Sequence, residues 1–347
     1  MKMTFRWYGE EDPVTLEQIR QIPGMKGVVS AIYDVPVGQV WPLERLRQVK
    51  QYCESKGLQW EVVESVPVHE SIKLGKPERM QLTKNYAQTI RNLGEIGIRC
   101  ICYNFMPVFD WLRTNLHSRL SDGSEALSYC PEELKTMDPR TAHLPGWDES
   151  YTQTELNGLL REYEGMTDAV LFDHLVWFLE QILPACRDTG IVMAIHPDDP
   201  PWRIFGLPRI ISSEQNLDAL FSAVPDCHNG LTFCTGSLGL RTENNLVSMA
   251  EKYAAAGRIF FAHLRNIQRE GPYRFAESAH LSSCGSLDMY GIVRALTRAG
   301  FDGYVRPDHG RMIWGEKGKP GYGLYDRALG AAYLNGLFEG ARKEKGI

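Results

Sequence analysis

Eight short apolar segments, separated by longer segments that mostly have helical spacing, limit the fold more than any other feature of this chain. The expected strands are Thr4–Tyr8, Gly27–Tyr33, Trp60–Val66, Cys100–Phe105, Ile191–His196, Leu231–Cys234, Ile259–Leu264 and Tyr304–Asp308. Several are almost continuously apolar, as in VVSAI, IVMAI and IFFAH, which is typical of parallel strands that are covered on both faces.

The segments between these strands predict amphipathic helices. The expected helices are Leu43–Ser55, Glu78–Glu95, Thr167–Asp188, Glu214–Ala223, Glu243–Ala256 and Met289–Ala299. Five of them end near a glycine that lies shortly before the next strand, as C-cap glycines do: Gly57, Gly97, Gly190, Gly257 and Gly300. Eight strands alternating with helices predict an α/β fold, a (β/α)₈ TIM barrel formed by residues 1–347 as one domain. The alternative, an open doubly wound sheet, is disfavoured because no G-x-G-x-x-G motif follows a strand.

One connection is too long to be an ordinary loop. Residues 106–165, after the fourth strand, contain Trp111, Trp147 and several prolines. Connections longer than about 15 residues are usually functional or disordered, and the aromatic content argues against disorder. We therefore expect a lid or small subdomain here. A surface insertion with only a packing role is the alternative.

Charge and composition exclude several classes of partner. The net charge is −5, which is the wrong sign for a non-specific nucleic-acid-binding face. The most apolar window, Ala169–Ala185, is interrupted by Asp173, His174, Glu180 and Pro184, so no membrane span is expected. The N-terminal residues are charged where a signal peptide would be apolar, and eight cysteines are too few for a disulfide scaffold, so a reducing cytoplasm is expected.

Four residues of metal-ligating types occur at the ends of four successive strands. His196, Cys234, His263 and Asp308 end the fifth to eighth expected strands, and each separation is about one strand, loop and helix long. The carboxyl ends of barrel strands meet at one rim, where barrel enzymes have their active sites. Each residue alone has an ordinary explanation as part of the core, but the four together predict a divalent metal site. The ligand types leave zinc, iron(II) and manganese open.

Other polar residues follow the seventh and eighth strands. Arg306 shares a face with Asp308 by alternation, so it is expected to capture a substrate carboxylate or to form a structural salt bridge. His309 is a candidate proton donor or acceptor. Arg265 and Asn266 extend past His263 and are candidates for substrate binding.

Three further residues are placed near the site by their position in loops. His280, after the seventh strand, is a candidate substrate contact. Tyr322 and Tyr325 lie between the eighth strand and the final helix, where a phenol can reach the site. Aromatic packing is the favoured interpretation for Tyr322, and Tyr325 is the preferred catalytic candidate.

The chain resembles the mannonate dehydratases, a family of the xylose-isomerase-like barrels. The resemblance covers essentially the whole chain and is carried by these motifs: FRWYG, IPGMKGVVSAIYDVPVG, ESVPVHE, CYNFMPVFDW, AIHPDDPP, FCTGS, AHLRN, GSLDMY, RPDHGRMIWGE and PGYGLYDRALG. It implies a hydro-lyase of hexuronate (glucuronate) catabolism that dehydrates D-mannonate to 2-keto-3-deoxy-D-gluconate and requires Mn²⁺ or Fe²⁺. A homodimer is also expected.

The resemblance places roles on particular residues. The family's metal ligands correspond to His196, Cys234, His263 and Asp308. Tyr325, His309 and Arg306 are expected to be catalytic, with Tyr325 and His309 as the acid–base pair in an unassigned order. Trp7, in the first motif, is expected to contact substrate together with Arg265, Asn266 and His280.

Two other functions are consistent with a metal site on this barrel. The first is a metal-dependent sugar isomerase or epimerase, although those sites tend to be rich in carboxylates whereas this one has a thiolate and one obvious carboxylate. The second is a non-catalytic protein that binds a sugar acid or a metal, for which closed tetrahedral coordination is the expected sign.

Overall fold

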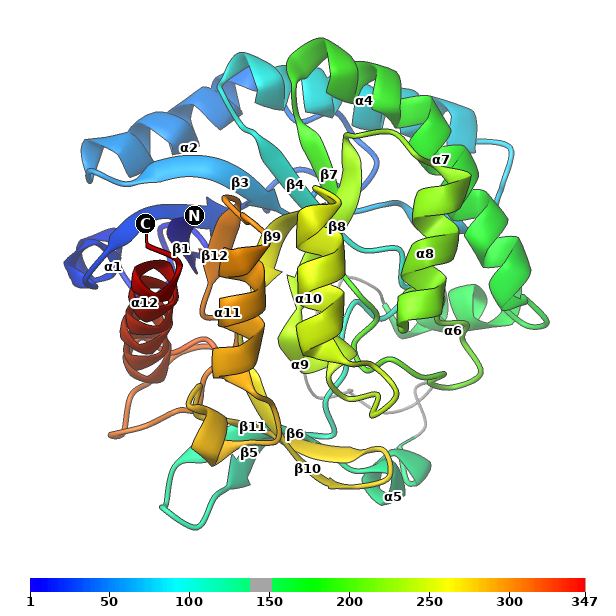
Figure 1. The fold of residues 1–347 in the computed structure, drawn as a ribbon. Helices are drawn as coiled ribbons and strands as arrows, with labels where there is room; N and C mark the ends of the chain where they lie inside the picture. The colour runs from blue at the N-terminus through cyan, green and yellow to red at the C-terminus, as the bar shows by residue number, and fades with distance from the viewer. Residues whose placement is uncertain (138–151, 347) are drawn as a thin grey trace.

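The computed structural model describes residues 1–137 and 152–346, and its centre is a closed barrel (Figure 1). Eight strands form the barrel, and each pairs in parallel with its neighbours. In order around the barrel they are β1 (Lys2–Arg6), β12 (Tyr304–Arg306), β9 (Ile259–His263), β8 (Asn229–Cys234), β7 (Val192–Ile195), β4 (Cys100–Tyr103), β3 (Gln59–Glu64) and β2 (Met25–Ser30). The predicted barrel fold is confirmed, and all eight expected strands are present.

Several strands end earlier than expected. Strand β12 stops at Arg306 and β7 at Ile195, so Asp308 and His196 lie one or two residues beyond their strands. Cys234 and His263 are the last residues of β8 and β9. The backbone leaves the sheet at these points because the following residues form the loops around the barrel mouth.

Helices surround the barrel, and all six expected ones are found. They are α2 (Leu43–Ser55), α4 (Arg79–Glu95), α7 (Asp168–Thr189), α8 (Glu214–Ala223), α10 (Leu246–Ala255) and α11 (Met289–Arg298). The five predicted C-cap glycines all have positive φ, between 65° and 82°, which L side chains rarely adopt. The other helices of the described residues are α1 (Leu16–Gln21), α3 (Glu70–Lys73), α5 (Pro131–Lys135), α6 (Gln153–Glu162), α9 (Thr235–Leu238), α12 (Tyr325–Lys345) and the 3₁₀ helix η1 (Ser282–Cys284).

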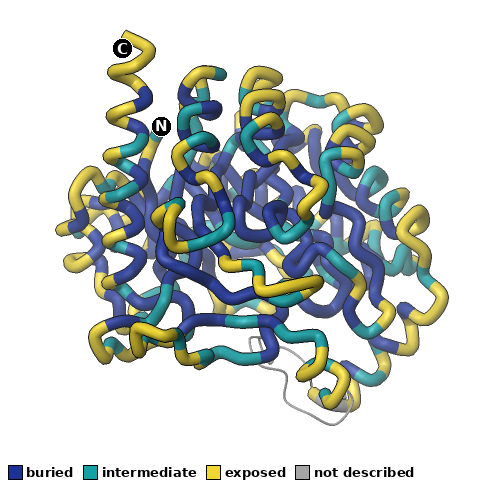
Figure 2. Tube along the Cα trace, turned by 60° about the horizontal axis from the view of Figure 1, so that its bottom comes forward, coloured by how far each residue is buried: buried dark blue, intermediate teal, exposed yellow. Residues whose placement is uncertain are grey.

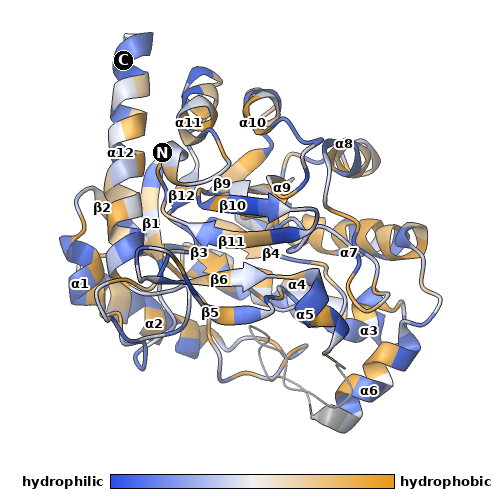
Figure 3. Ribbon diagram, turned by 90° about the horizontal axis from the view of Figure 1, so that it is seen from below, coloured by the Kyte–Doolittle hydropathy of each residue, from blue (hydrophilic) through white to orange (hydrophobic). Residues whose placement is uncertain are grey.

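A second sheet, which the sequence analysis did not predict, lies at one end of the barrel (Figures 1 and 3). Its four antiparallel strands, in order, are β10 (Asn266–Gly271), β11 (Arg274–Ser278), β6 (Glu125–Tyr129) and β5 (Asn115–Arg119). The β10–β11 hairpin follows β9 directly, whereas β5 and β6 belong to the expected insertion after β4. The hairpin escaped prediction because its sequence is polar and contains a Gly-Pro pair, which is typical of a loop.

The insertion thus joins the barrel through a sheet that it shares with the β10–β11 hairpin. Residues 138–151, with Trp147, lie outside the described residues. Whether residues 106–165 act as a lid stays a prediction.

Helix α7 is, within the described residues, the one helix long and apolar enough by length and composition to cross a membrane. Its apolar side chains pack inside the protein: Leu175, Phe178 and Ile182 are fully buried in the main hydrophobic core. The Phe178 ring packs at 5.1 Å against Tyr86 of α4 and at 6.2 Å against Tyr103 of β4. The apolar composition of α7 is therefore explained by its packing on the barrel, where buried segments lie beneath a ring of exposed helix surface (Figure 2).

Candidate metal centre

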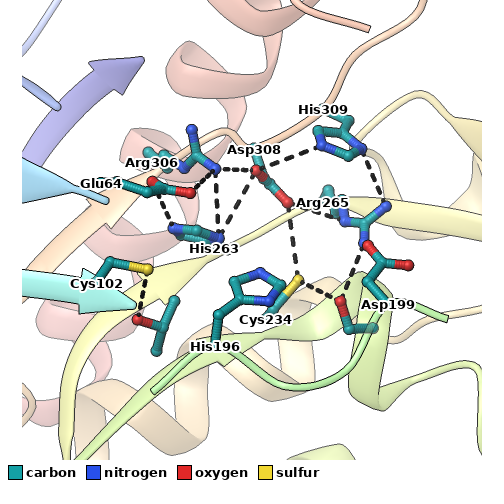
Figure 4. Close-up of polar contacts among 12 residues, drawn as sticks. Glu64, Cys102, His196, Asp199, Cys234, His263, Arg265, Arg306, Asp308 and His309 are labelled. Atoms are coloured by element: carbon teal, nitrogen blue, oxygen red, sulfur yellow. Dashed lines mark hydrogen bonds and ion pairs between the residues drawn. The ribbon is translucent and has the colours of Figure 1, made fainter. Parts of the chain in front are cut away.

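Four predicted ligands meet at the carboxyl ends of β7, β8, β9 and β12. One ligand atom from each of His196, Cys234, His263 and Asp308 lies within 4.8 Å of the others. The strand register explains the convergence, because His263 pairs with Cys234 on one side and with Arg306 on the other. Three of the four residues are fully buried, and His196 is partly exposed at the mouth. The structure therefore brings together the four residues that the sequence singled out (Figure 4).

The two imidazoles are oriented by different neighbours. His196 Nδ1 lies 2.7 Å from the carbonyl oxygen of Pro197, which leaves Nε2 for a ligand. His263 presents Nδ1 towards Asp308 Oδ1 at 3.7 Å, and its ring centroid is 5.1 Å from that of His196. Cys234 Sγ lies 3.7 Å from Asp308 Oδ2 and accepts a hydrogen bond from the Ser237 hydroxyl at 3.1 Å.

The electrostatics of the centre favour a divalent cation. Burial disfavours the Cys234 thiolate, but Arg265 and His196 outweigh burial and lower the pKa of Cys234 well below its ordinary value. The pKa of Asp308 is likewise lowered, because Arg306 and His309 outweigh burial. Burial also opposes protonation of His196, but Cys234 and Asp308 raise its pKa to about 9. Two anionic groups thus hold positive charge between them, and the donor set of one thiolate, one carboxylate and two imidazoles fits a transition-metal ion.

Two buried arginines flank the centre in different ways. Arg265 has an anionic neighbour at each of its three nitrogens: Nη2 donates to Asp199 at 2.6 Å, Nη1 donates to Glu277, and Nε forms an ion pair at 2.9 Å with Asp308 Oδ2. Arg306 donates through Nη2 to Glu64 at 3.0 Å and to Asp308, while its Nε and Nη1 have no hydrogen-bond partner in the described part of the chain. Arg306 therefore has N–H groups free for a substrate anion, whereas the contacts of Arg265 favour a role in holding the site together.

An ion cluster links the insertion to the barrel mouth. Arg113, from the insertion, donates to both carboxylate oxygens of Asp199, at 2.9 and 3.0 Å, and to Glu277 of β11 at 2.8 Å. All three side chains are at most 2 % exposed. The same two carboxylates contact Arg265, so the cluster joins the second sheet to the metal centre.

Arg113→Met is expected to lower the free energy of unfolding by about 3–5 kcal/mol, because it leaves two buried carboxylates with Arg265 as their one remaining guanidinium partner. Chemical denaturation measures the change. Arg274→Met is the control, since Arg274 contacts Glu132 at 2.8 Å between exposed side chains and such a pair contributes about 1 kcal/mol or less. Equal effects of the two variants would contradict the importance of the buried cluster.

His309 and Tyr322 form a hydrogen-bonded pair beside the centre. His309 Nε2 lies 2.8 Å from the Tyr322 hydroxyl, and its Nδ1 lies 3.1 Å from Glu277 Oε1. Tyr325 is elsewhere: it begins α12, is 41 % exposed, and packs its ring at 5.6 Å against Trp314, which is 75 % exposed. Contacts therefore favour Tyr322 as the phenol of the site, although the sequence favoured packing for it. The role expected for Tyr325 stays a prediction.

The other three residues predicted to contact substrate, Asn266, Trp7 and His280, either make hydrogen bonds to the backbone or are buried by neighbouring side chains and helices. Asn266 donates to the Leu281 carbonyl at 2.7 Å and accepts from the backbone of Ile267 at 2.9 Å. Trp7 is 3 % exposed and stacks at 5.8 Å on Tyr52 of α2, in the layer between barrel and helices.

His280 is 2 % exposed and packs beneath α12. A Cβ on Gly330 would lie 2.5 Å from the His280 ring, so the helix covers this side chain closely. Substrate contact by Asn266, Trp7 and His280 stays a prediction.

Several residues of the site were missed by the sequence analysis: Arg6, Glu64, Arg113, Asp199 and Glu277. Glu64 ends β3 and was accessible to the strand-end argument, which instead placed the end of that strand at Val66. Arg6 ends β1, is buried, and helps to lower the pKa of Glu64, whereas the next side chain, Trp7, packs on the opposite side against Tyr52. Glu277 lies in β11 of the second sheet, and Arg113 lies just before β5 of the same sheet. The sequence has no pattern at these positions comparable to the polar residues at the barrel strand ends.

Comparisons with known proteins agree with this site. The family model for D-mannonate dehydratase (UxuA) matches residues 1–347. Mannonate dehydratase 2 of Halalkalibacterium halodurans is 54% identical over 341 residues, covering 98% of this chain and 99% of that protein. The mannonate dehydratase of Thermotoga maritima is 50% identical over 357 residues, covering 99% of each.

One solved structure supports the family, and a more distant one supports only the fold. The crystal structure of mannonate dehydratase from Streptococcus suis serotype 2 has a TM-score of 0.94 and 47% identity, covering 100% of this chain and 96% of that one. A D-psicose 3-epimerase structure has a TM-score of 0.56 at 11% identity, covering 97% and 99%, and shows only that the fold is shared. This chain belongs to the D-mannonate dehydratase family.

Proposed function

We propose that this protein is a hydro-lyase that converts D-mannonate to 2-keto-3-deoxy-D-gluconate and water. The observation that carries the proposal is the convergence of His196, Cys234, His263 and Asp308 at one rim of the barrel, in a chain that belongs to this family. The relatives named above are themselves called mannonate dehydratases and match this chain along nearly its whole length.

We propose that these four residues hold Mn²⁺ or Fe²⁺. When bound, the ion stabilises negative charge that develops on the substrate oxygens. A buried centre with two anionic ligands supports this assignment, and the mixed donor set is compatible with either metal.

The chain's own residues have separate tasks in the reaction. Dehydration removes the proton at C2, which is weakly acidic beside a carboxylate, and expels the C3 hydroxyl as water after it gains a proton. The resulting enol becomes the 2-keto group of the product, so one molecule of water is lost in total. Arg306, through its unpartnered Nε and Nη1, binds the substrate carboxylate and stabilises its developing charge.

His309 and Tyr322 are the acid–base pair in this proposal. Burial and the neighbouring Tyr8 raise the pKa of Tyr322 well above its ordinary value, so its phenol begins the reaction protonated. Its hydrogen bond to His309 gives the proton a direct path between the two groups. Glu277 and Arg265, which both contact His309 Nδ1, hold that ring in place.

Removal of the metal is expected to abolish turnover of D-mannonate. The protein is treated with a chelator under anaerobic conditions, and Mn²⁺ and Fe²⁺ are added back separately while the keto-deoxy acid product is measured. Recovery with either ion supports the proposal. Full activity in the chelated protein, or a product that retains its C3 oxygen as an isomerase or epimerase product does, contradicts it.

The expected location and assembly remain proposals. All eight cysteines are unpaired, which supports a reducing compartment such as the cytoplasm. The expected homodimer has no direct support beyond exposed apolar residues of α12 and its neighbourhood, such as Leu329 and Trp314.

A further inference from the structure

His263 has different neighbours at its two ring nitrogens. Nδ1 faces the candidate metal centre, with Asp308 Oδ1 at 3.7 Å and Arg306 Nη2 at 3.5 Å, whereas Nε2 faces Glu64 Oε2 at 3.4 Å, outside the centre (Figure 4). A neutral imidazole that binds a cation through one nitrogen carries its proton on the other. The proton on Nε2 would then point at the Glu64 carboxylate.

Both atoms of this contact lack another partner. His263 Nε2 and Glu64 Oε2 are each inaccessible to solvent, and neither makes a hydrogen bond elsewhere in the described ranges 1–137 and 152–346. A buried donor and a buried acceptor left unpaired would each be costly, and at 3.4 Å each atom is the nearest available partner of the other. His196 is held differently, because its Nδ1 is within hydrogen-bond distance of a backbone carbonyl oxygen, that of Pro197.

Glu64 is itself held firmly. It is the last residue of β3, in register with Cys102 of β4, and its Oε1 accepts a hydrogen bond from Arg306 Nη2 at 3.0 Å. Arg306 and His263 outweigh burial and lower the pKa of Glu64, so the group is an ionised acceptor. One carboxylate therefore contacts both a candidate metal ligand and the arginine proposed to bind substrate.

We propose that Glu64 is a positioning residue that orients His263 as a metal ligand, forming a carboxylate–histidine–metal arrangement. Such carboxylates fix the ring and its tautomer, and their loss typically weakens metal binding about 10–100-fold. The inference rests on the proposed function, because it assumes that the four-residue centre binds a metal ion.

A second cation site is the competing interpretation, because Glu64, Cys102 and His263 also place ligand atoms within 4.8 Å of one another. Cys102 argues against it. Its Sγ accepts a hydrogen bond from the Thr232 hydroxyl at 3.2 Å, and burial together with Glu64 raises its pKa well above the ordinary value, so it remains a neutral thiol. Neutral thiols are poor metal ligands.

The first test measures Mn²⁺ binding to the full-length protein by competition with a chelator, with free Mn²⁺ detected by electron paramagnetic resonance. Glu64→Gln is expected to raise the Kd about 10–100-fold while one ion still binds. Glu70→Gln is the matched control: Glu70 is a buried glutamate that contacts Lys73, Tyr163 and the Val108 backbone, none of which belongs to the centre. Its Kd is expected to stay within about twofold of the parent value.

The second test begins with the parent protein and then compares the variant with it. In the Co²⁺-loaded parent protein, two exchangeable, hyperfine-shifted N–H proton signals are expected, one from each histidine ligand. Both should be lost in D₂O. In Glu64→Gln, one signal should shift or broaden by faster exchange, while the His196 signal, held by the Pro197 carbonyl, stays in place.

The outcomes separate the two proposals. Failure of the parent protein to bind Mn²⁺ overturns the proposed metal centre. Normal binding by the parent with an unchanged Kd in Glu64→Gln, or a single N–H signal in the Co²⁺ protein, overturns only the role of Glu64. A stoichiometry that falls from two ions to one in Glu64→Gln makes Glu64 a direct ligand and also overturns the inference.

Discussion

Replacing Cys234 by serine is expected to lower kcat/KM for D-mannonate by about a thousandfold or more. The metal's contribution to stabilising charge is several kcal/mol, and each 1.36 kcal/mol corresponds to a factor of ten in rate. The Cys234 thiolate is already favoured by Arg265 and His196, whereas a serine hydroxyl in the same position remains neutral. The centre would lose one of its two anionic ligands. Steady-state kinetics at saturating Mn²⁺, together with the Mn²⁺ Kd, measure both parts of the loss.

Cys102→Ser is the control for this change. Cys102 is also a buried thiol near His263, but it is neutral and hydrogen-bonded to Thr232, so its replacement should leave Mn²⁺ affinity nearly unchanged. A loss in Cys102→Ser as large as that in Cys234→Ser would show that the ligand set has been assigned to the wrong thiol.

Tyr322→Phe is expected to lower kcat about 10²- to 10⁴-fold, which is the usual contribution of a general acid or base. Tyr322 is buried, and its hydroxyl lies 2.8 Å from His309 Nε2. Phenylalanine fills the same space without the proton, so the fold and KM should change little. Rapid-quench or steady-state turnover of D-mannonate provides the measurement.

The comparison with Tyr325→Phe decides between the two phenols. Tyr325 is half-exposed beside Trp314, so its replacement should have the smaller effect on kcat. Tyr333→Phe is the control, because the Tyr333 hydroxyl lies 3.4 Å from Ser282, away from the metal centre. A large loss in Tyr325→Phe with full turnover in Tyr322→Phe would restore the assignment that the sequence favoured and would require the loop before α12 to rearrange around substrate.

The amino-acid sequence alone was enough to predict the barrel and the four residues that meet at its rim as a candidate metal centre. Both follow from short-period patterns: nearly continuous apolar strands, helices between them, and one polar residue where each of four strands ends. Closure of a parallel barrel brings all carboxyl strand ends to one rim, so ligands far apart in the chain can be paired without knowing any loop. Cys234, His263 and Arg306 illustrate this, because they lie side by side in the register of β8, β9 and β12.

Only the tertiary structure decided which side chains surround that centre. Tyr322 rather than Tyr325 contacts His309, and Arg265 already pairs with Asp199 and Glu277. The irregular backbone of the loops determines which of these side chains points inward. Arg113 and Glu277 reach the mouth through the second sheet, whose pairing joins segments about 150 residues apart. The periodicity of apolar residues along the sequence shows which residues share a face of one strand or helix. Contacts such as Arg113 with Glu277 depend on the path of the whole chain, and no local pattern encodes them.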